Sequence, residues 1–238
     1  MLRRRLRLPP LTRAMATLAE LTAIWAGCTD CVLSQTRTTV VVGDGDPSAD
    51  LMFVGEAPGL HEDQRGVPFV GQAGKLLDEL LETIGLTRAD CYIANVLKCR
   101  PPGNRDPQPE EIAACQGKLH AQIAAVQPRL ICTLGNFATK LLSGREYGVT
   151  RVHGQARRAT FGGHRVVLYP LYHPAAALYN QRLRPELEHD VSRIPDLLRM
   201  LAQDGELADV ASAVAAPAPG VAAEIVPPPP EPEQLGLF

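Results

Sequence analysis

Four of the six cysteines in the chain are spaced as ligands of a metal centre. Cys28 and Cys31 form a Cys-x2-Cys pair, and Cys99 and Cys115 follow much later, at the two ends of the Arg- and Pro-rich segment CRPPGNRDPQPEEIAAC. Four thiolates can bind Zn²⁺ or an iron–sulfur cluster, and the spacing alone does not choose between them. We predict a metal or cluster site that joins distant parts of the chain.

The other two cysteines have a simpler interpretation. Cys91 and Cys132 lie in the apolar runs CYIANVL and RLICTLG, which is typical of reduced cysteines in a protein core. Reduced core cysteines remain the alternative for the first four as well. Because no secretory segment precedes the cysteines, we expect a reducing, cytoplasmic compartment rather than disulfides.

Composition limits the classes of protein. A chain of 238 residues with 45% hydrophobic residues can bury one substantial core. We find no apolar run long enough to span a bilayer and therefore expect a soluble protein. The formal net charge of −2 argues against a chain that is basic throughout, but a local basic face would be enough to bind nucleic acid.

The chain divides into four parts. Residues 1–14 carry five arginines and no acid, as expected of a transit peptide, a disordered basic arm or a start codon placed upstream of Met15; we favour the last two. Residues 15–202 form one predicted domain. Residues 203–233 are rich in Ala and Pro and are predicted to be a disordered linker, which leaves the pentapeptide 234–238 at the end.

Short apolar runs alternate with helical patterns inside the domain. Four runs predict buried strands of a parallel sheet: LMFVGE (51–56), CYIANVL (91–97), RLICTLG (129–135) and VVLYPLYH (166–173). Helical spacing covers 73–86, 109–126, GNFATKLL and the region of 187–202. The predicted fold is therefore α/β, a three-layer sandwich with a central, mainly parallel four-stranded sheet.

Polar residues follow these strands at one predicted edge. Ligands of such sheets bind beyond the carboxyl ends of the strands. The first strand runs into GEAPGLHEDQRGVPFVGQAGKLL, the second ends near Asn95, and the fourth ends at His173. Arg100 and Arg105 lie close to the second end. A carboxylate-bearing loop, an amide and a histidine are therefore expected to converge.

These segments together resemble the family 4 uracil-DNA glycosylases, the iron–sulfur branch of the uracil-DNA glycosylase superfamily. The resemblance covers about residues 15–200 and rests on the four cysteines, GEAPGLHED, GVPFVGQAGKLL, NVLKCRPPGNRDPQPEE and HPAAAL, in that order. It implies a DNA-repair hydrolase that flips uracil out of DNA and cleaves its N-glycosidic bond. It also implies a [4Fe–4S] cluster on Cys28, Cys31, Cys99 and Cys115.

The resemblance assigns roles around the base. Phe69 matches the stacking phenylalanine, and Asn95 carries the donor and acceptor suited to uracil O4 and N3–H. His173 would donate a hydrogen bond to uracil O2 as charge grows on the leaving base. Ordinary structural roles are the alternatives: a core aromatic, a strand-end amide and a structural histidine. Asn104 is added to the substrate-binding set.

The carboxylates are less clearly assigned. Ala57 stands where the classical uracil-DNA glycosylases carry a water-activating Asp, and Gly59 stands where they carry a Tyr that blocks the methyl group of thymine. Glu62 is expected to orient the water, with Glu56 as the second catalytic carboxylate. We expect the mechanism to depend mainly on stabilising the leaving group.

Contacts to DNA are expected on both sides of the base pocket. Leu178 or Tyr179 would fill the space of the flipped base, since apolar side chains commonly enter unstacked steps. Arg100, Arg105 and Arg182 suit phosphates, unless they are simply solvated surface charges.

Two other functions and one further partner are consistent with the sequence. The chain could be a Zn-stapled nucleotide-binding protein without catalysis, or a relative that binds uracil-DNA covalently. The covalent relative has Gln at the position of Ala57 and a basic, histidine-bearing insertion, and we find neither here. The tail resembles the QLxLF peptide that binds the bacterial sliding clamp, through Gln234, Leu235, Leu237 and Phe238. We expect a monomer associated with the nucleoid and no membrane partner.

Overall fold

The computed structural model describes residues 16–203. The basic extension, residues 204–233 of the Ala/Pro-rich segment and the tail peptide lie outside the described residues, so the predictions made for them remain predictions. Within residues 16–203, no helix is long and apolar enough to cross a membrane.

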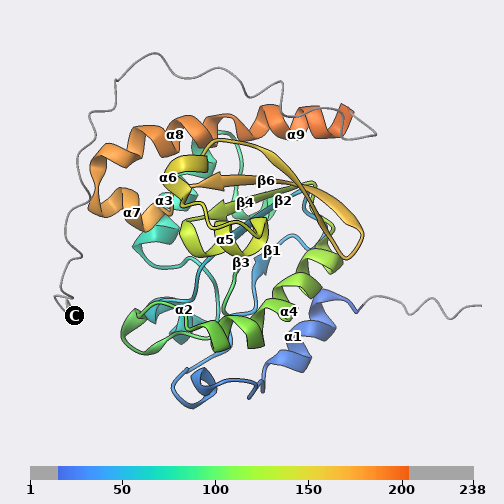
Figure 1. Cartoon of the computed structure of the whole chain (residues 1–238), viewed down its shortest axis with the longest axis vertical. Helices are drawn as coiled ribbons and strands as arrows, with labels where there is room; N and C mark the ends of the chain where they lie inside the picture. The colour runs from blue at the N-terminus through green and yellow to red at the C-terminus, as the bar shows by residue number, and fades with distance from the viewer. Residues whose placement is uncertain (1–15, 204–238) are drawn as a thin grey trace, which may run out of the picture.

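A single mixed sheet forms the centre of the fold (Figure 1). It has six strands in the order β1-β3-β2-β4-β6-β5. The four inner strands run parallel to one another and the two edge strands run antiparallel to their neighbours. The bounds are β1 Asp44–Gly45, β2 Leu51–Gly55, β3 Tyr92–Asn95, β4 Leu130–Leu134, β5 Arg157–Phe161 and β6 His164–Leu171.

The expectation of four strands was therefore wrong at both edges of the sheet. The inner strands β2 and β4 are buried along their whole length, which produces the continuous apolar runs seen in the sequence. By contrast, β1 has two exposed residues, and β5 has the largely exposed sequence RRATF. Edge strands of this kind carry charge that opposes edge-to-edge pairing, and they leave no hydrophobic pattern to detect.

Helices cover both faces of the sheet, which gives three layers (Figure 1). Along β2, Leu51 and Phe53 belong to one hydrophobic core cluster, and Met52 and Val54 belong to the other, because successive side chains point to opposite faces. The first cluster includes residues of α3 Gln72–Thr83, α8 Arg184–Ser192 and α9 Ile194–Gln203. The second includes residues of α1 Leu18–Trp25, α4 Pro109–Val126 and α5 Asn136–Ser143.

Shorter elements lie in the connections between the longer helices and strands. The α-helices are α2 Leu60–Arg65, α6 Val149–Val152 and α7 Pro174–Tyr179. Single 3₁₀ turns span η1 Val32–Gln35, η2 Arg88–Asp90, η3 Pro102–Asn104 and η4 Gln181–Leu183. Because α2 follows β2 and α7 follows β6, both begin at the carboxyl edge of the sheet.

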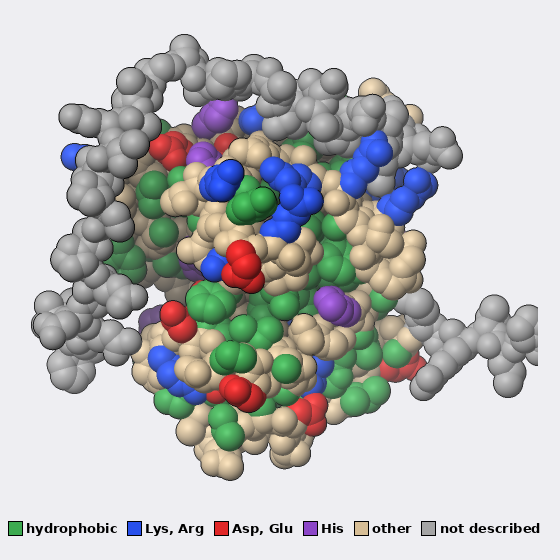
Figure 2. All heavy atoms as spheres, viewed as in Figure 1, with side chains coloured by type: hydrophobic (Ala, Val, Ile, Leu, Met, Phe, Trp, Pro, Cys, Tyr) green, Lys and Arg blue, Asp and Glu red, His purple; other side chains and the backbone are tan. Residues whose placement is uncertain are grey.

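Charge is distributed unevenly over the surface. Figure 2 shows one face of the molecule, and Lys and Arg side chains gather on the upper part of that face, around α5, α6 and the β5–β6 hairpin. The segments from α6 to β6 contribute Arg151, Arg157, Arg158 and Arg165. A net charge near zero is therefore compatible with a local basic face.

Candidate active site and cysteine pocket

The predicted base-binding residues meet at the carboxyl edge of the sheet. Asn95 ends β3, and His173 follows β6 as the N-cap of α7. Gly55, the last residue of β2, lies directly against Asn95 and Phe69: a Cβ placed there would come within 2.5 Å of Asn95 Oδ1 and 2.6 Å of Phe69 Cζ. Only a residue without a side chain allows this approach.

Phe69 is held in an unusual backbone conformation. Its φ of 53° lies in the left-handed region, which is strained for a bulky aromatic residue, and its side chain is buried. Arg88 donates hydrogen bonds to the carbonyls of Phe69, at 2.7 Å, and Pro68, at 2.5 Å. Gly74 permits the same loop, because a Cβ there would lie 1.8 Å from Phe69 O. The ring is therefore fixed before any ligand binds.

Asn95 presents an unpaired acceptor. The residue is 2% exposed, and its Oδ1 has no hydrogen-bond partner among residues 16–203. Buried polar atoms are nearly always paired, because an unpaired one costs about 1–3 kcal/mol. A site that lacks only a donor for this oxygen is suited to a ligand that brings an N–H group.

His173 is held as a neutral hydrogen-bond donor. Its Nδ1 accepts the backbone N–H of Ala175 at 3.1 Å, so the proton of the neutral ring must lie on Nε2. Burial lowers the pKa of His173 to about 4, and the charge of Glu62 only partly opposes this shift. At neutral pH the ring can donate from Nε2 without carrying a charge.

Glu62 organises the loop that carries Phe69. Its Oε1 accepts the backbone N–H groups of Val70 and Gly71, each at 2.8 Å, and Gly71 is the N-cap of α3. Its Oε2 lies over Gly59, where a Cβ would be 2.7 Å away. One carboxylate oxygen is therefore engaged in the fold, and the other lies beside the space that Gly59 leaves open.

Glu56 and Ala57 follow β2 directly. Burial, and secondarily the charge of Asp106, raises the pKa of Glu56 to about 7. A carboxyl group with this pKa can exchange a proton near neutral pH. Ala57 is partly buried and packs against the second core cluster, and its methyl group cannot activate water.

The predicted wedge residues are exposed beside this site. Leu178 is 43% exposed and Tyr179 is 93% exposed, both on α7, the helix that His173 caps. Arg182 follows in the exposed turn η4. Large side chains exposed to this extent do not contribute to the core.

The loop that carries Arg100 and Arg105, called the arginine loop below, makes more hydrogen bonds within itself and to α4 than expected. Arg105 makes two hydrogen bonds to the buried carboxylate of Glu111, at 2.6 and 3.0 Å. Arg100 donates to the side chain of the exposed Asn104 at 2.7 Å. Among the hydrogen bonds of residues 16–203, none joins Asn104 or Arg105 to the pocket residues.

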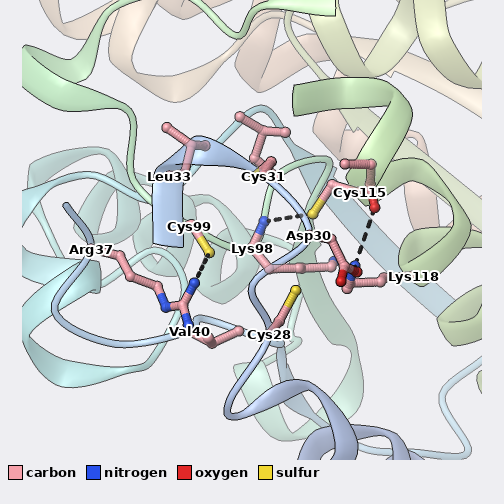
Figure 3. Close-up of a pocket in the computed structure, with 12 residues that line it drawn as sticks. Cys28, Asp30, Cys31, Leu33, Arg37, Val40, Lys98, Cys99, Cys115 and Lys118 are labelled. Atoms are coloured by element: carbon pink, nitrogen blue, oxygen red, sulfur yellow. Dashed lines mark hydrogen bonds and ion pairs between the residues drawn. The ribbon is translucent and has the colours of Figure 1, made fainter. Parts of the chain in front are cut away.

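All four predicted ligand cysteines line one pocket (Figure 3). Cys28 and Cys31 come from the segment after α1, Cys99 from the loop after β3, and Cys115 from α4. No three His, Cys, Asp or Glu side chains within residues 16–203 are close enough together to hold a metal ion. The pocket gathers the four cysteines from three separate parts of the chain.

The surroundings of these sulfurs suit an anionic group. Arg37 donates to Cys99 Sγ at 3.5 Å, and the backbone N–H of Lys98 donates to Cys115 Sγ at 3.3 Å. Lys118 also lines the pocket and pairs with Asp30 at 2.6 Å (Figure 3). Cationic groups and N–H donors of this kind stabilise metal-bound thiolates. The donor set therefore fits a thiolate-ligated centre.

Burial favours the protonated thiol at two of the four cysteines, Cys99 and Cys115, when no metal competes. It raises the pKa of Cys99 to about 11, with a smaller opposing effect from Arg37, and it also raises the pKa of Cys115. Cys91 and Cys132 lie fully buried in the sheet region, outside this pocket, as predicted for core residues.

Sequence reasoning missed the residues that hold the site in place. Gly55, Gly74 and Arg88 fix Phe69 and Asn95, and Lys98 is 1% exposed. Arg88 and Lys98 act on backbone carbonyls, and such contacts leave no recognisable sequence pattern. The glycines of GEAPG and GQAGK were visible, but their closeness to Phe69 depends on the fold.

Comparisons with known proteins agree in family. The profile described as the uracil DNA glycosylase superfamily matches residues 42–197. A type-4 uracil-DNA glycosylase from Sulfurisphaera tokodaii is 47% identical over 175 residues, which cover 71% of this chain and 80% of that protein. The Archaeoglobus fulgidus protein of the same name is 46% identical over 187 residues, covering 77% and 94%. The Thermotoga maritima protein is 43% identical over 175 residues, covering 72% and 90%.

Proposed function

The chain belongs to the uracil DNA glycosylase superfamily, and on that premise we propose that it excises uracil from DNA and leaves an abasic site. The observation that carries the proposal is the buried, unpaired Oδ1 of Asn95 beside the fixed ring of Phe69. A flipped uracil would stack on Phe69 and donate a hydrogen bond to the unpaired Oδ1 of Asn95.

Asn95 accounts for the choice of base. Uracil offers N3–H to Asn95 Oδ1 and O4 to Asn95 Nδ2. Cytosine reverses this pattern, so it would leave buried polar groups unpaired on both sides, which is a strong basis for rejection. Arg88 and Gly74 hold Phe69 in place, so the ring is positioned before the base arrives and binding pays less for ordering it.

His173 stabilises the departing base. Its Nε2–H donates to uracil O2, where negative charge accumulates as the glycosidic bond breaks. A positioned donor of this kind contributes about 3 kcal/mol of transition-state stabilisation. The hydrogen bond from Ala175 keeps Nδ1 as an acceptor and so holds the proton on Nε2.

Two carboxylates remain for water and for the positive charge that develops on the sugar. Oε1 of Glu62 is engaged by Val70 and Gly71, which leaves Oε2 to orient a water molecule. Glu56 has a pKa of about 7, so its ionised form can accept a proton at neutral pH and above. Neither interaction requires Ala57 to take part.

Cys28, Cys31, Cys99 and Cys115 would hold a [4Fe–4S] cluster. When bound, it would join the segment after α1 to the arginine loop and to α4, and so brace the surface that faces DNA. Arg37, the N–H of Lys98 and Lys118 would balance the charge of its thiolates.

DNA would be gripped from two sides. Leu178 or Tyr179 would fill the space left by the flipped base, since both project from the helix that His173 caps. Arg100 and Arg182 would contact phosphates. Arg105 would act mainly by holding its loop through Glu111, and to a lesser degree on DNA.

The test of this function is excision from a labelled oligonucleotide. Uracil placed opposite guanine, opposite adenine and in single-stranded DNA should be removed, and alkali should then cleave the strand at the abasic site. Matched oligonucleotides carrying cytosine or thymine at that position serve as controls. Absence of alkali-labile product from every uracil substrate, with folded protein, would contradict the proposal.

The C-terminal peptide, residues 234–238, would bind the sliding clamp of the host. The enzyme would act as a monomer at the nucleoid. Leu237 and Phe238 offer two apolar anchors, and Gln234 offers an amide; Leu235 completes the peptide. Calorimetry with residues 224–238 should give an affinity of about micromolar, since ordering the peptide costs part of the contact energy. The same peptide with Leu237 and Phe238 changed to Ala should not bind; equal affinity of the two peptides would reject the clamp as a partner.

A further inference from the structure

A buried lysine lies between the candidate base-binding residues and the cysteine pocket. Lys98 is 1% exposed, yet its side chain makes two hydrogen bonds, neither of them to a carboxylate. Its Nζ donates to the backbone carbonyl of Asn95 at 2.6 Å and to Oε1 of Gln122. A lysine is rarely buried in this way, because removing its charge from water is costly unless the site requires it.

The backbone of the same residue reaches the cysteines. The N–H of Lys98 donates to Cys115 Sγ at 3.3 Å, and Lys98 immediately precedes Cys99. Gln122 is one of the residues of α4, the helix that also carries Cys115. Its Nε2 donates to Val42 O at 2.7 Å and to the hydroxyl of Tyr92 at 3.1 Å. The lysine is therefore held by both α4 and the end of β3.

The geometry points to Lys98 as a positioning residue that fixes the Asn95 amide for uracil and ties its orientation to the occupied cysteine site. This inference rests on the proposed function, in which Asn95 reads the base and the four cysteines hold a cluster. It assigns a role to a residue whose side-chain hydrogen bonds go to the Asn95 carbonyl and to Gln122, and not to the cysteines.

The geometry of the turn after β3 explains how Lys98 would orient the Asn95 amide. The chain turns immediately after Asn95, where Val96 N donates to Gly55 O and Leu97 N donates to Glu56 O, each at 2.9 Å. Lys98 Nζ closes this turn on the Asn95 carbonyl, three residues back. With the carbonyl fixed, the Cα–Cβ direction of Asn95 is fixed, and its amide stays over Gly55. Without this bond, the Asn95 peptide can rotate and the amide loses its alignment.

Lys98→Met tests the role, because methionine keeps most of the volume and removes the donors. For the brown holoprotein we expect KM for a uracil oligonucleotide to rise about tenfold, as for the loss of one buried hydrogen bond, with kcat changed less than threefold. A purely structural role would lower the active fraction, so that kcat would fall and KM would stay the same.

Lys118→Met is the matched control. Lys118 also lines the cysteine pocket, but its hydrogen bonds go to Asp30 and to the Ala114 carbonyl. We expect it to lose iron at least as readily as Lys98→Met, and its iron-loaded fraction to show a smaller rise in KM than that of Lys98→Met. An equal rise in KM in both variants would mean that pocket charge, rather than the Asn95 contact, is responsible, and would overturn the proposal.

Hydrogen exchange gives a readout independent of activity. The amides of Val96 and Leu97 should exchange faster in holo Lys98→Met than in holo Lys118→Met or the parental protein, because the turn is released. If the parental protein does not excise uracil, the proposed function fails, and this exchange measurement alone decides whether Lys98 orders Asn95. Unchanged exchange together with unchanged KM would refute the role.

Lys98→Gln provides a second variant in case the first does not fold. Its shorter side chain keeps a polar group beside Gln122 but does not extend as far as the Asn95 carbonyl, so the same rise in KM is expected. Failure of both variants to give folded, brown protein would assign Lys98 to stability alone and would equally overturn the proposal.

Discussion

The imidazole of His173 stacks on the ring of Phe69, with ring centroids 5.6 Å apart and planes inclined by 29°. The stacking surface for the base and the donor to the leaving group therefore support each other. Gly135 lies behind the histidine, where a Cβ would come within 3.2 Å of His173 Cβ. Packing on both sides holds the ring where Nε2 can meet a bound base.

His173→Ala should lower the single-turnover rate of uracil excision by about 100-fold and change the affinity for uracil-DNA little, since the hydrogen bond forms mainly in the transition state. His120→Ala is a matched control, because His120 lies at the same 5.6 Å from a phenylalanine ring, Phe161, away from the site. Rapid-quench kinetics checks the prediction. A parental rate in His173→Ala would remove this residue from the mechanism.

Glu56→Gln should raise stability above neutral pH while lowering activity. Burial raises the pKa of Glu56 from 4.5 to about 7, so the folded state holds its proton more tightly than the unfolded state. The parental protein therefore loses stability as pH rises from about 4.5 to 7, and that loss is complete above 7. The glutamine variant avoids the loss.

Thermal unfolding at a series of pH values checks this expectation. The melting temperature of Glu56→Gln should exceed that of the parental protein at pH 8 and should match it near pH 4.5. A variant that is less stable at pH 8 would show that the ionised carboxylate is stabilised by its surroundings instead.

The central part of the fold and site could be predicted because it follows from periodicity and topology. Buried parallel strands produce continuous apolar runs, and parallel strands bring their carboxyl ends to one edge. The sequence alone therefore predicts that Asn95 and His173 lie at the same edge. The strands β1 and β5 were missed because exposed edge strands carry no such pattern.

The supporting contacts could not be predicted because they depend on tertiary structure. Lys98 reads as a surface residue in the segment NVLKCR, and its burial depends on Gln122, which lies 24 residues later. Arg105 reads as a phosphate ligand, but the fold brings Glu111 against it. The charge of a side chain shows which groups it can bind, but the tertiary structure determines which of those groups lies next to it.

Cys99→Ala should abolish bound iron and lower the melting temperature, while Cys91→Ala should keep its iron. Cys99 lines the four-cysteine pocket, whereas Cys91 is buried in the sheet region outside it. Anaerobic purification, absorption near 400 nm and iron analysis check the difference, with about four irons per chain expected in the parental protein. Stoichiometric zinc without iron would contradict the assignment of a [4Fe–4S] cluster.

Gly55→Ala should disrupt the arrangement of the base-binding residues. Its Cβ would lie 2.5 Å from Asn95 Oδ1 and 2.6 Å from Phe69 Cζ, so the amide or the ring must move. Phe69 is buried and its backbone is held by Arg88, which leaves the amide as the group that can turn away. We expect uracil excision to fall at least 100-fold. The affinity for uracil-DNA should fall by a larger factor than the excision rate of the bound complex.

Gly117→Ala is the control for adding a methyl group. Gly117 lies in α4, and a Cβ there meets nothing within 4 Å, so this variant should be as active as the parental protein and slightly more stable, by about 0.5–1 kcal/mol. Excision kinetics and melting temperatures of both variants decide the outcome. A folded Gly55→Ala protein with parental excision of uracil would mean that the base does not bind against Asn95 and Phe69.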